Sequence, residues 1–319
     1  MLVFQYHLTT PPRITPLRLK PIFSPLCIFF MALVLSFSPV LTYADDTAIY
    51  WSITKQEKAV GYLLGTIHSE DPRVLDFPLD FLDQLGSNQV FAMELVPDLP
   101  TLQKLTNYMR YQDGTSLQSQ VGQGRFKEIL KLLSRYQVPP DWIENMKVWA
   151  VVMTLSVPPP ETGFFLDFSL SLRAAGSGLK VVGLETLDQQ LSFLEEMPMP
   201  QQLELLDQAM TDYQRVQEVH DQMVDAYLAD DLQALRKESE LQLGQLELQL
   251  KEYFIERGIN VRNRRMLASL LPLLEESAVF VAVGALHLPG EQGLIALLRE
   301  AGYQLQPQPL PFAQLPVEQ

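Results

Sequence analysis

The chain alternates short, wholly apolar runs with longer stretches in which apolar residues recur at helical spacing. A run of four to eight apolar residues between turn-forming residues is typical of a buried strand. The first two such runs flank a polar turn at 54–58, which predicts a hairpin. In all, strands are expected at residues 48–53, 59–64, 89–93, 179–184, 279–283 and 303–306.

The stretches with helical spacing lie between these strands. The segment 200–250 is rich in Gln, Glu, Leu and Asp, and its apolar residues are spaced for one helical face, so we expect a long helical arm or hairpin there. Further helices are expected at 74–85, at 99–156 with breaks near 113–114 and 139–140, at 164–175 and at 256–274. This alternation predicts an α/β fold with a mixed, mostly parallel central sheet flanked by helices.

Two of the predicted strands end in the same motif, a glycine followed three residues later by a histidine. Gly65 precedes His68 and Gly284 precedes His287, although the whole chain has only four histidines. Ligands of α/β folds bind in the crevice past the carboxyl ends of parallel strands, so both histidines are expected to face one crevice. The repeat also suggests that the sheet is built from two related halves. His220, in the helical arm, has no neighbours at ligand spacing and is interpreted as a surface residue.

The first 44 residues have the pattern of an export signal. Three basic residues precede an uncharged, largely apolar stretch at 21–44, and cleavage is expected after Ala44. The protein is therefore predicted to be periplasmic or secreted, with residues 45–319 as one domain and 200–250 as a helical insertion. The alternative is an uncleaved membrane anchor through 21–44, because that stretch approaches a span of about 20 residues. Cys27 lies within it, so the mature chain has no thiol.

Composition narrows the function classes further. With 319 residues, 47 % of them hydrophobic, the chain is long enough to bury a sizeable core. The formal net charge of −14 and the lack of a basic stripe argue against nucleic acid as a partner and against strongly anionic substrates. A mature chain without cysteine has neither disulfides nor a cysteine nucleophile.

Carboxylates follow two other predicted strands, at Glu94 and Glu185. With His68 and His287 they form the imidazole and carboxylate set that zinc, manganese or cobalt accepts. Two histidines and one glutamate would leave an open position for water, and the other glutamate would serve as a general base. The alternative is structural, because a histidine after a strand is commonly satisfied by a backbone partner and such distant residues carry no local signature.

Arg262 and Asn263 begin a run of polar residues on the predicted helix 256–274. An arginine that reached the crevice would anchor a substrate carboxylate or stabilise a developing oxyanion, to which its planar fork is suited. The alternative is that the run lies on the exposed face of an amphipathic helix.

These motifs occur in the order found in the TraB/GumN family, which this chain resembles from about residue 50 to 303. The segments that carry the resemblance are 65–68, 93–94, 182–186 with Gln189 or Gln190 behind, 262–263 and 283–290. The family is grouped with the Tiki proteins, membrane-tethered metal-dependent proteases that clip the amino-terminal part of secreted signalling proteins. It is more distantly related to the erythromycin esterase-like and ChaN-like haem-binding proteins.

The resemblance implies a TraB/GumN-like α/β domain with a metal-dependent site. It implies metal ligands at His68, Glu94 and His287, catalytic residues at Glu94, Glu185, Arg262 and Asn263, and a supporting role for Asp167. Which glutamate binds the metal and which accepts a proton stays open, as does the identity of the divalent ion among manganese, cobalt and zinc.

The function expected from these features is an exported metal-dependent hydrolase, a peptidase acting on a peptide or protein, in contact with a membrane only if the amino-terminal segment stays uncleaved. One alternative is a non-enzymatic periplasmic binding protein for a peptide or a haem-like ligand. Another is a hydrolase without metal, in which histidine and glutamate act as base and acid.

Overall fold

The computed structural model of the protein describes residues 47–243 and 246–312. The predicted signal peptide or anchor, residues 1–44, lies outside these ranges. Within them, no helix combines the length and the apolar character that crossing a membrane requires.

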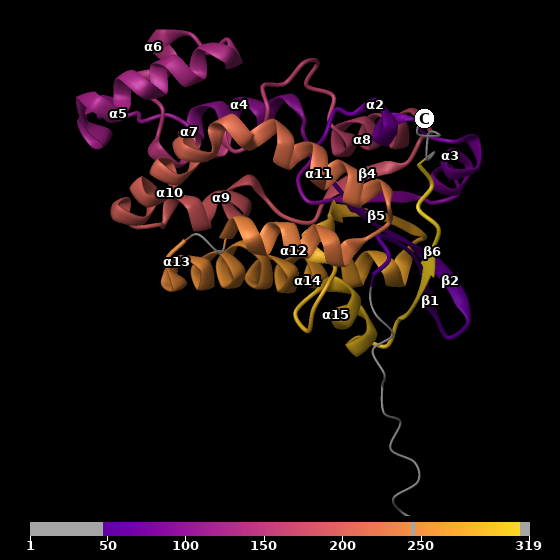
Figure 1. Ribbon diagram of the computed structural model, residues 1–319. Helices are drawn as coiled ribbons and strands as arrows, with labels where there is room; N and C mark the ends of the chain where they lie inside the picture. The colour runs from indigo at the N-terminus through magenta and orange to yellow at the C-terminus, as the bar shows by residue number, and fades with distance from the viewer. Residues whose placement is uncertain (1–46, 244–245, 313–319) are drawn as a thin grey trace, which may run out of the picture. The chain divides into compact units, whose positions relative to one another are not determined.

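A six-stranded sheet forms the centre of the described structure (Figure 1). Four neighbouring strands run parallel, and two further strands extend the sheet on one side with antiparallel pairing. This confirms the predicted mixed, mostly parallel sheet. In spatial order the strands are β4 (Lys180–Gly183), β3 (Val90–Met93), β5 (Val279–Gly284), β2 (Lys58–Thr66), β1 (Tyr50–Lys55) and β6 (Gln304–Gln308).

The predicted hairpin joins β1 to β2. Gln56 and Glu57 both have positive φ, at 49° and 65°, as the two central residues of a type I′ turn do, and this turn matches the twist of the paired strands. Strand β2 then enters the middle of the sheet.

Strands β2 and β5, which carry the two Gly-x-x-His motifs, lie side by side. Their parallel ladder runs from Gly61 opposite Val279 to Thr66 opposite Gly284. At Gly61, with φ of 150°, a Cβ atom would lie 1.9 Å from the carbonyl oxygen of Val279, so only glycine permits this approach. Both motifs therefore leave the sheet at the same edge.

Helices account for most of the rest of the described chain. Those between β2 and β4 are α2 (Pro72–Leu75), α3 (Leu79–Gly86), α4 (Leu99–Tyr108), α5 (Leu117–Leu133), α6 (Pro140–Ile143), α7 (Val148–Leu155) and α8 (Leu166–Gly176). Those after β4 are α9 (Leu187–Glu195), α10 (Met199–Asp212), α11 (Val216–Leu228), α12 (Leu232–Leu243), α13 (Leu248–Tyr253), α14 (Val261–Glu276) and α15 (Leu294–Glu300). Short 3₁₀ turns η1 (Ser134–Tyr136), η2 (Tyr213–Arg215) and η4 (Ala285–His287) and the π-helical turn η3 (Phe254–Asn260) join some of them.

Two hydrophobic clusters hold these elements together. The larger packs the sheet against residues of α3, α8, α11, α12, α14 and α15. The smaller is made largely of helices α5, α7, α9 and α10, which lie together in Figure 1 away from β1, β2 and β6. Because apolar burial is the main favourable term in folding, each cluster fixes its own set of helices, and the candidate site lies where segments of both meet.

Two predicted helical segments differ in detail from what is observed. The segment 74–85 is two short helices, α2 and α3, because Pro78 stands between them at the start of α3. The segment expected as an arm is a succession of helices, α10 to α12, that packs into the fold. Leu206 is buried in the smaller cluster and Tyr227 in the larger one.

Candidate functional site

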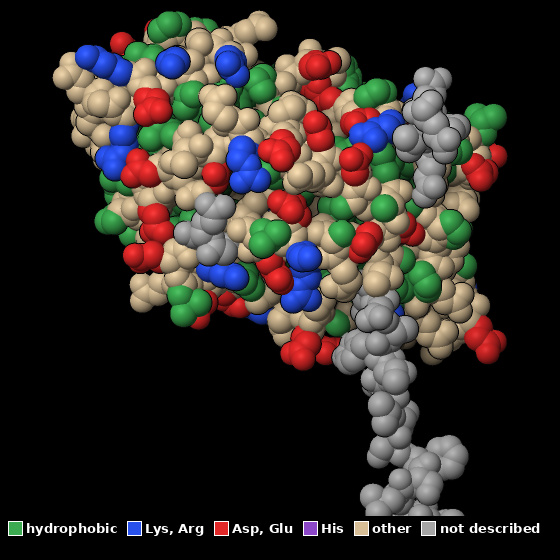
Figure 2. Space-filling view, viewed as in Figure 1, with side chains coloured by type: hydrophobic (Ala, Val, Ile, Leu, Met, Phe, Trp, Pro, Cys, Tyr) green, Lys and Arg blue, Asp and Glu red, His purple; other side chains and the backbone are tan. Residues whose placement is uncertain are grey.

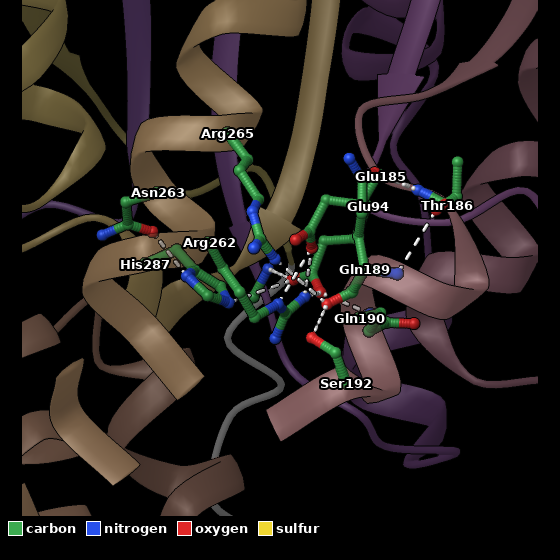
Figure 3. A network of polar contacts seen from close by, with 11 residues as sticks. Glu94, Glu185, Thr186, Gln189, Gln190, Ser192, Arg262, Asn263, Arg265 and His287 are labelled. Carbon is green, nitrogen blue, oxygen red and sulfur yellow. Dashed lines mark hydrogen bonds and ion pairs between the residues drawn. The ribbon is translucent and has the colours of Figure 1, made fainter. Parts of the chain in front are cut away.

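The predicted site residues follow neighbouring parallel strands or lie on a helix that crosses their ends. Glu185 follows β4, Glu94 follows β3 and His287 follows β5, while Arg262 and Asn263 lie in the first turn of α14. The π-helical turn η3 leads directly into α14, and such turns are frequent near functional sites. These five residues lie close together in Figure 3.

Arg262 links the two glutamates in a largely buried ion-pair network. Its Nε and Nη2 atoms donate to Glu185 Oε2 at 2.9 and 2.7 Å, and Nη2 also donates to Glu94 Oε2 at 2.5 Å (Figure 3). The Glu185 side chain has no exposed surface, and its Oε1 atom has no hydrogen-bond partner within the described chain. Burial raises the pKa of Glu185 despite the neighbouring guanidinium, whereas the guanidinium stays charged.

Glu94 is held through both carboxylate oxygens. Gly284 N donates to Oε1 at 2.8 Å, and Gln190 Nε2 donates to Oε2 at 3.0 Å. Burial opposes ionisation of Glu94, but the charges of protonated His287 and of Arg262 and the hydrogen bond from Gly284 outweigh it and lower the pKa to about 2. A Cβ atom at Gly284 would lie 3.2 Å from Oε1, so the glycine gives the carboxylate its room. Glu94 is therefore a carboxylate at neutral pH.

The protonation state of His287 follows from its neighbours. Asn263 Nδ2 donates to the carbonyl of Gln292 at 2.7 Å, so Asn263 Oδ1 faces His287 Nδ1, at 2.6 Å. That oxygen only accepts, and Nδ1 must therefore carry the proton. Burial, opposed by Glu94 and aided by Arg262, lowers the pKa of His287 to about 4. At neutral pH the imidazole is uncharged and its Nε2 atom presents a lone pair.

The Nε2 atom of His287 lies 3.6 Å from Glu94 Oε1. Two acceptor atoms thus approach each other in a largely buried place, which is unfavourable unless a cation lies between them. Zinc binds imidazole nitrogen and carboxylate oxygen at about 2.0–2.2 Å, so two ligands of one ion are separated by a distance of this order. Asn263 also supplies the outer hydrogen bond that metal-binding histidines usually have. His287 and Glu94 fit the requirements of two metal ligands.

His68 has different surroundings. Its side chain is 61 % exposed, its ring stacks on Phe165 with 3.9 Å between centroids, and its Nδ1 lies 3.6 Å from Asp167 Oδ2. Thr66 donates to the other oxygen of Asp167 at 2.5 Å. Within 47–243 and 246–312 no hydrogen bond or ion pair joins His68 to Glu94 or His287, and no three His, Cys, Asp or Glu side chains are grouped as metal ligands.

Sequence reasoning missed several partners of the site. Phe165, beside His68, and the carbonyl of Gln292, behind Asn263, belong to segments that no motif marks. Thr66 lies within the first motif, but its contact with Asp167 was not predicted. Gln190 was visible only as one of two candidates. The side chain of Gln189 is engaged in a capping box with Thr186 at the start of α9, whereas Gln190 donates to Glu94. The Thr-x-x-Gln pattern of a capping box was visible in the sequence and would have assigned the site contact to Gln190.

Comparison with known proteins adds a second line of evidence. A family model described as the TraB/PrgY/gumN family matches residues 49–307. The metalloprotease TIKI homolog of Nematostella vectensis is 22 % identical over 312 residues, 80 % of this chain and 66 % of that protein. Metalloprotease TIKI2 of Xenopus tropicalis is 23 % identical over 320 residues, 83 % of this chain and 60 % of that protein. Metalloprotease TIKI1 of Danio rerio is 23 % identical over 318 residues, 83 % of this chain and 64 % of that protein.

The chain thus spans less than two thirds of the length of these relatives. No solved structure gives a significant match. The family match extends from the first strand to the last and includes every residue of the site described above. The protein belongs to the TraB/PrgY/gumN family.

Proposed function

We propose that the protein is an exported, metal-dependent peptidase. The observation that supports this most is the pair formed by His287 Nε2 and Glu94 Oε1, 3.6 Å apart in a largely buried place, where Asn263 fixes the His287 tautomer. The names of the similar proteins, all metalloproteases, favour the same reaction class and a peptide or protein substrate.

Under this proposal His287 and Glu94 hold a divalent ion, and His68, from the adjacent strand end, supplies the third ligand. His68 is exposed, so its side chain can leave Asp167 and Phe165 at small cost. A divalent ion bound there would polarise the scissile carbonyl and acidify a water molecule. Manganese, cobalt and zinc all accept this donor set.

The remaining residues fix the site and bind the substrate. Asn263 holds the His287 tautomer, and Gly284 and Gln190 hold the Glu94 carboxylate. The Glu185 side chain is buried and pairs with Arg262, so of the two glutamates whose roles the sequence left open we assign to Glu185 the positioning of Arg262. Arg262 Nη1 has no acceptor in the described chain, so it is available to donate to an oxyanion that develops on the substrate.

Export is proposed from the sequence of residues 1–44 alone. The basic residues and apolar stretch there follow the order of a secretion signal, with cleavage after Ala44. Amino-terminal sequencing of the protein recovered from a periplasmic fraction tests this, and an intact amino terminus in the membrane fraction would favour the anchor.

The test of the activity is hydrolysis of a peptide library by the purified protein with manganese, cobalt or zinc, read by mass spectrometry. We expect cleavage that a chelator abolishes and added metal restores. Glu94→Gln and His287→Ala should each lower the rate at least about 100-fold, as loss of a metal-site residue does. His220→Ala, on α11, removes a histidine that pairs with Asp221 and with none of the proposed metal ligands; it should cleave at the wild-type rate and serves as the matched control. Absence of cleavage with every metal would overturn the proposal and favour a binding protein.

A second candidate, hydrolysis without metal, has one observation in its favour. His68 lies against Asp167, as a general base and the carboxylate that orients it do. Cleavage that survives a chelator and is lost in Asp167→Asn would support this candidate over the first.

A further inference from the structure

A surface pocket of about 510 Å³ lies where the end of α4 meets the segment that precedes α7. Its walls are preformed, because the two segments pair as a short antiparallel bridge at Arg110 and Met146. Tyr111 N donates to the carbonyl of Asn145 at 2.8 Å, and Lys147 N donates to that of Met109 at 2.8 Å. The backbone on these two sides of the pocket is therefore held in place by hydrogen bonds.

Three basic side chains line this pocket, but only one of them lacks an acidic partner. Lys104 pairs with Asp188 and Lys147 pairs with Glu195, each at 2.5 Å. Arg110 forms no ion pair within the described residues, and its Nε atom is buried without an acceptor.

The position of Arg110 is fixed by an aromatic ring. Its guanidinium carbon lies 4.9 Å from the ring centre of Trp142, so one face is covered. The donors of a guanidinium lie in its plane, and those of its two terminal nitrogens remain available to a ligand. Asp113, the acidic residue of the pocket, accepts from Thr115 N at 3.0 Å and forms no recorded ion pair with Arg110.

The pocket is connected to the candidate site through the first turn of α9. Asp188 accepts from Lys104 and, at 2.7 Å, from the hydroxyl of Tyr108 in the pocket wall, whereas Gln190 donates to Glu94. Residues two apart on a helix face different sides of it, so the pocket and the candidate site lie on two sides of the first turn of α9. A peptide that passes around this turn would contact both.

We propose that this pocket is a carboxylate subsite for the peptide substrate, with Arg110 as the group that binds the carboxylate. The inference rests on the proposed function for the identity of the ligand. A carboxylate matches the edge of a guanidinium formed by its two terminal nitrogens, with two parallel hydrogen bonds. Tyr108 and Tyr111 supply aromatic surface for the residue that bears the carboxylate or its neighbour.

The charge of the protein limits the ligand to few negative charges. The chain carries a formal −14, and on the face shown in Figure 2 acidic side chains lie scattered among the basic ones without a continuous basic area. A polyanion would be repelled by this field, while one carboxylate can pair with one uncompensated guanidinium. The carboxylate can come from a peptide's carboxyl terminus or from an acidic side chain.

The test is isothermal titration calorimetry of the purified protein with three tetrapeptides, in the presence of a chelator so that binding is measured without hydrolysis. The probes are alanyl-glycyl-glycyl-phenylalanine as the free acid, the same peptide as its amide, and the amide with glutamate at the third position. They are titrated into wild type, Arg110→Gln, Arg110→Lys and the control Arg135→Gln. Arg135 also lies over an aromatic ring, that of Tyr213, but is not among the residues that line the pocket.

We expect at least one carboxylate peptide to bind wild type at least about tenfold more tightly than the amide, since an unpaired charge in a site strongly penalises the wrong ligand. Tight binding of the free acid identifies a terminal carboxylate, and tight binding of the glutamate peptide identifies an acidic side chain. Arg110→Gln should remove this preference, Arg110→Lys should keep part of it, and Arg135→Gln should leave it unchanged.

Equal binding of all three peptides to wild type, or an unchanged preference in a folded Arg110→Gln variant, would overturn the proposal. Thermal unfolding of each variant shows whether it is folded. Because binding is read without turnover, a protein that binds the carboxylate but cleaves nothing would contradict the proposed peptidase activity and not this subsite.

Discussion

The two Gly-x-x-His motifs have the same spacing and follow adjacent parallel strands, yet their histidines differ in environment. The His287 side chain is 6 % exposed and the His68 side chain is 61 % exposed. The ladder between β2 and β5 ends with Thr66 opposite Gly284, so the motifs are offset by one residue. His287 continues into the 3₁₀ turn η4, which turns it back into the fold, whereas His68 follows a strand that continues as an irregular segment.

The partners of the two histidines differ just as clearly. His287 lies between Asn263 and Glu94, both held by further hydrogen bonds, and is fixed as a neutral imidazole. His68 has a ring partner and one carboxylate at a distance too long for a hydrogen bond. The comparison teaches that the motif fixes where a histidine leaves the sheet, while residues remote in sequence fix its charge and its freedom to move.

The largest expected effect on stability comes from removing Arg262, the cation beside the buried histidine, His287. Arg262→Ala leaves Glu94 and Glu185 without their shared partner, and we expect a loss of about 3–5 kcal/mol in the free energy of unfolding, measured by urea denaturation. Arg264→Ala, two residues along the same helix, removes an exposed pair with Glu256 and should cost no more than about 1 kcal/mol. Similar losses in the two variants would contradict the account of the buried network.

The second largest effect is the pH dependence of the free energy of unfolding, measured on chelator-treated protein, to which His287 and not His68 is expected to contribute. The folded-state pKa of His287 is lowered from 6.5 to about 4. Between these values the unfolded chain binds a proton that the folded protein does not, so stability falls as pH falls from about 6.5 to about 4. At about 1.4 kcal/mol per pKa unit, the loss is up to about 3 kcal/mol.

The measurement is the unfolding free energy at several pH values down to pH 4.5, above the range in which Glu94 titrates. The loss should persist in His68→Ala and be absent in His287→Gln. An equal slope in His287→Gln and wild type would show that another group is responsible.

Replacing each histidine by alanine at neutral pH should give the smallest of these changes in the free energy of unfolding. His287→Ala opens a cavity and leaves the buried Asn263 Oδ1 without a donor, which should cost about 2 kcal/mol. His68→Ala removes an exposed ring and should change stability by no more than about 0.5 kcal/mol. Denaturant midpoints of the two chelator-treated variants test this, and an ordering opposite to the expected one would contradict the assigned environments.

Local pattern predicted much of the fold. Apolar runs predicted the strands of the sheet, and the alternation of strands and helices predicted its mostly parallel arrangement. That β2 lies beside β5 does not follow from this alternation. The apolar spacing at 74–85 predicted one helix, whereas Pro78 separates α2 from α3. The burial of residues 200–250 was not predictable from one amphipathic face, because periodicity shows which face is apolar and not what covers it.

The candidate site was predictable to a smaller extent. The strand ends identified Glu94, Glu185 and His287, and the resemblance identified Arg262 and Asn263, all of which the fold brings together. The position of His68 against Phe165 depends on α8 and the segment before it, which lie about a hundred residues further along the chain, so no spacing rule reaches it. Arg110 was missed because its significance lies in a missing partner, which only a structure reveals.

The most direct test of the central claim, that the His287 and Glu94 pair is part of a metal site completed by His68, is metal content by elemental mass spectrometry. Wild type, His287→Ala, His68→Ala and the control His220→Ala are each reconstituted with manganese, cobalt and zinc and then desalted. The account predicts about one metal ion per chain in wild type and in His220→Ala, and none in the other two variants. Full metal content in a folded His287→Ala variant would contradict it.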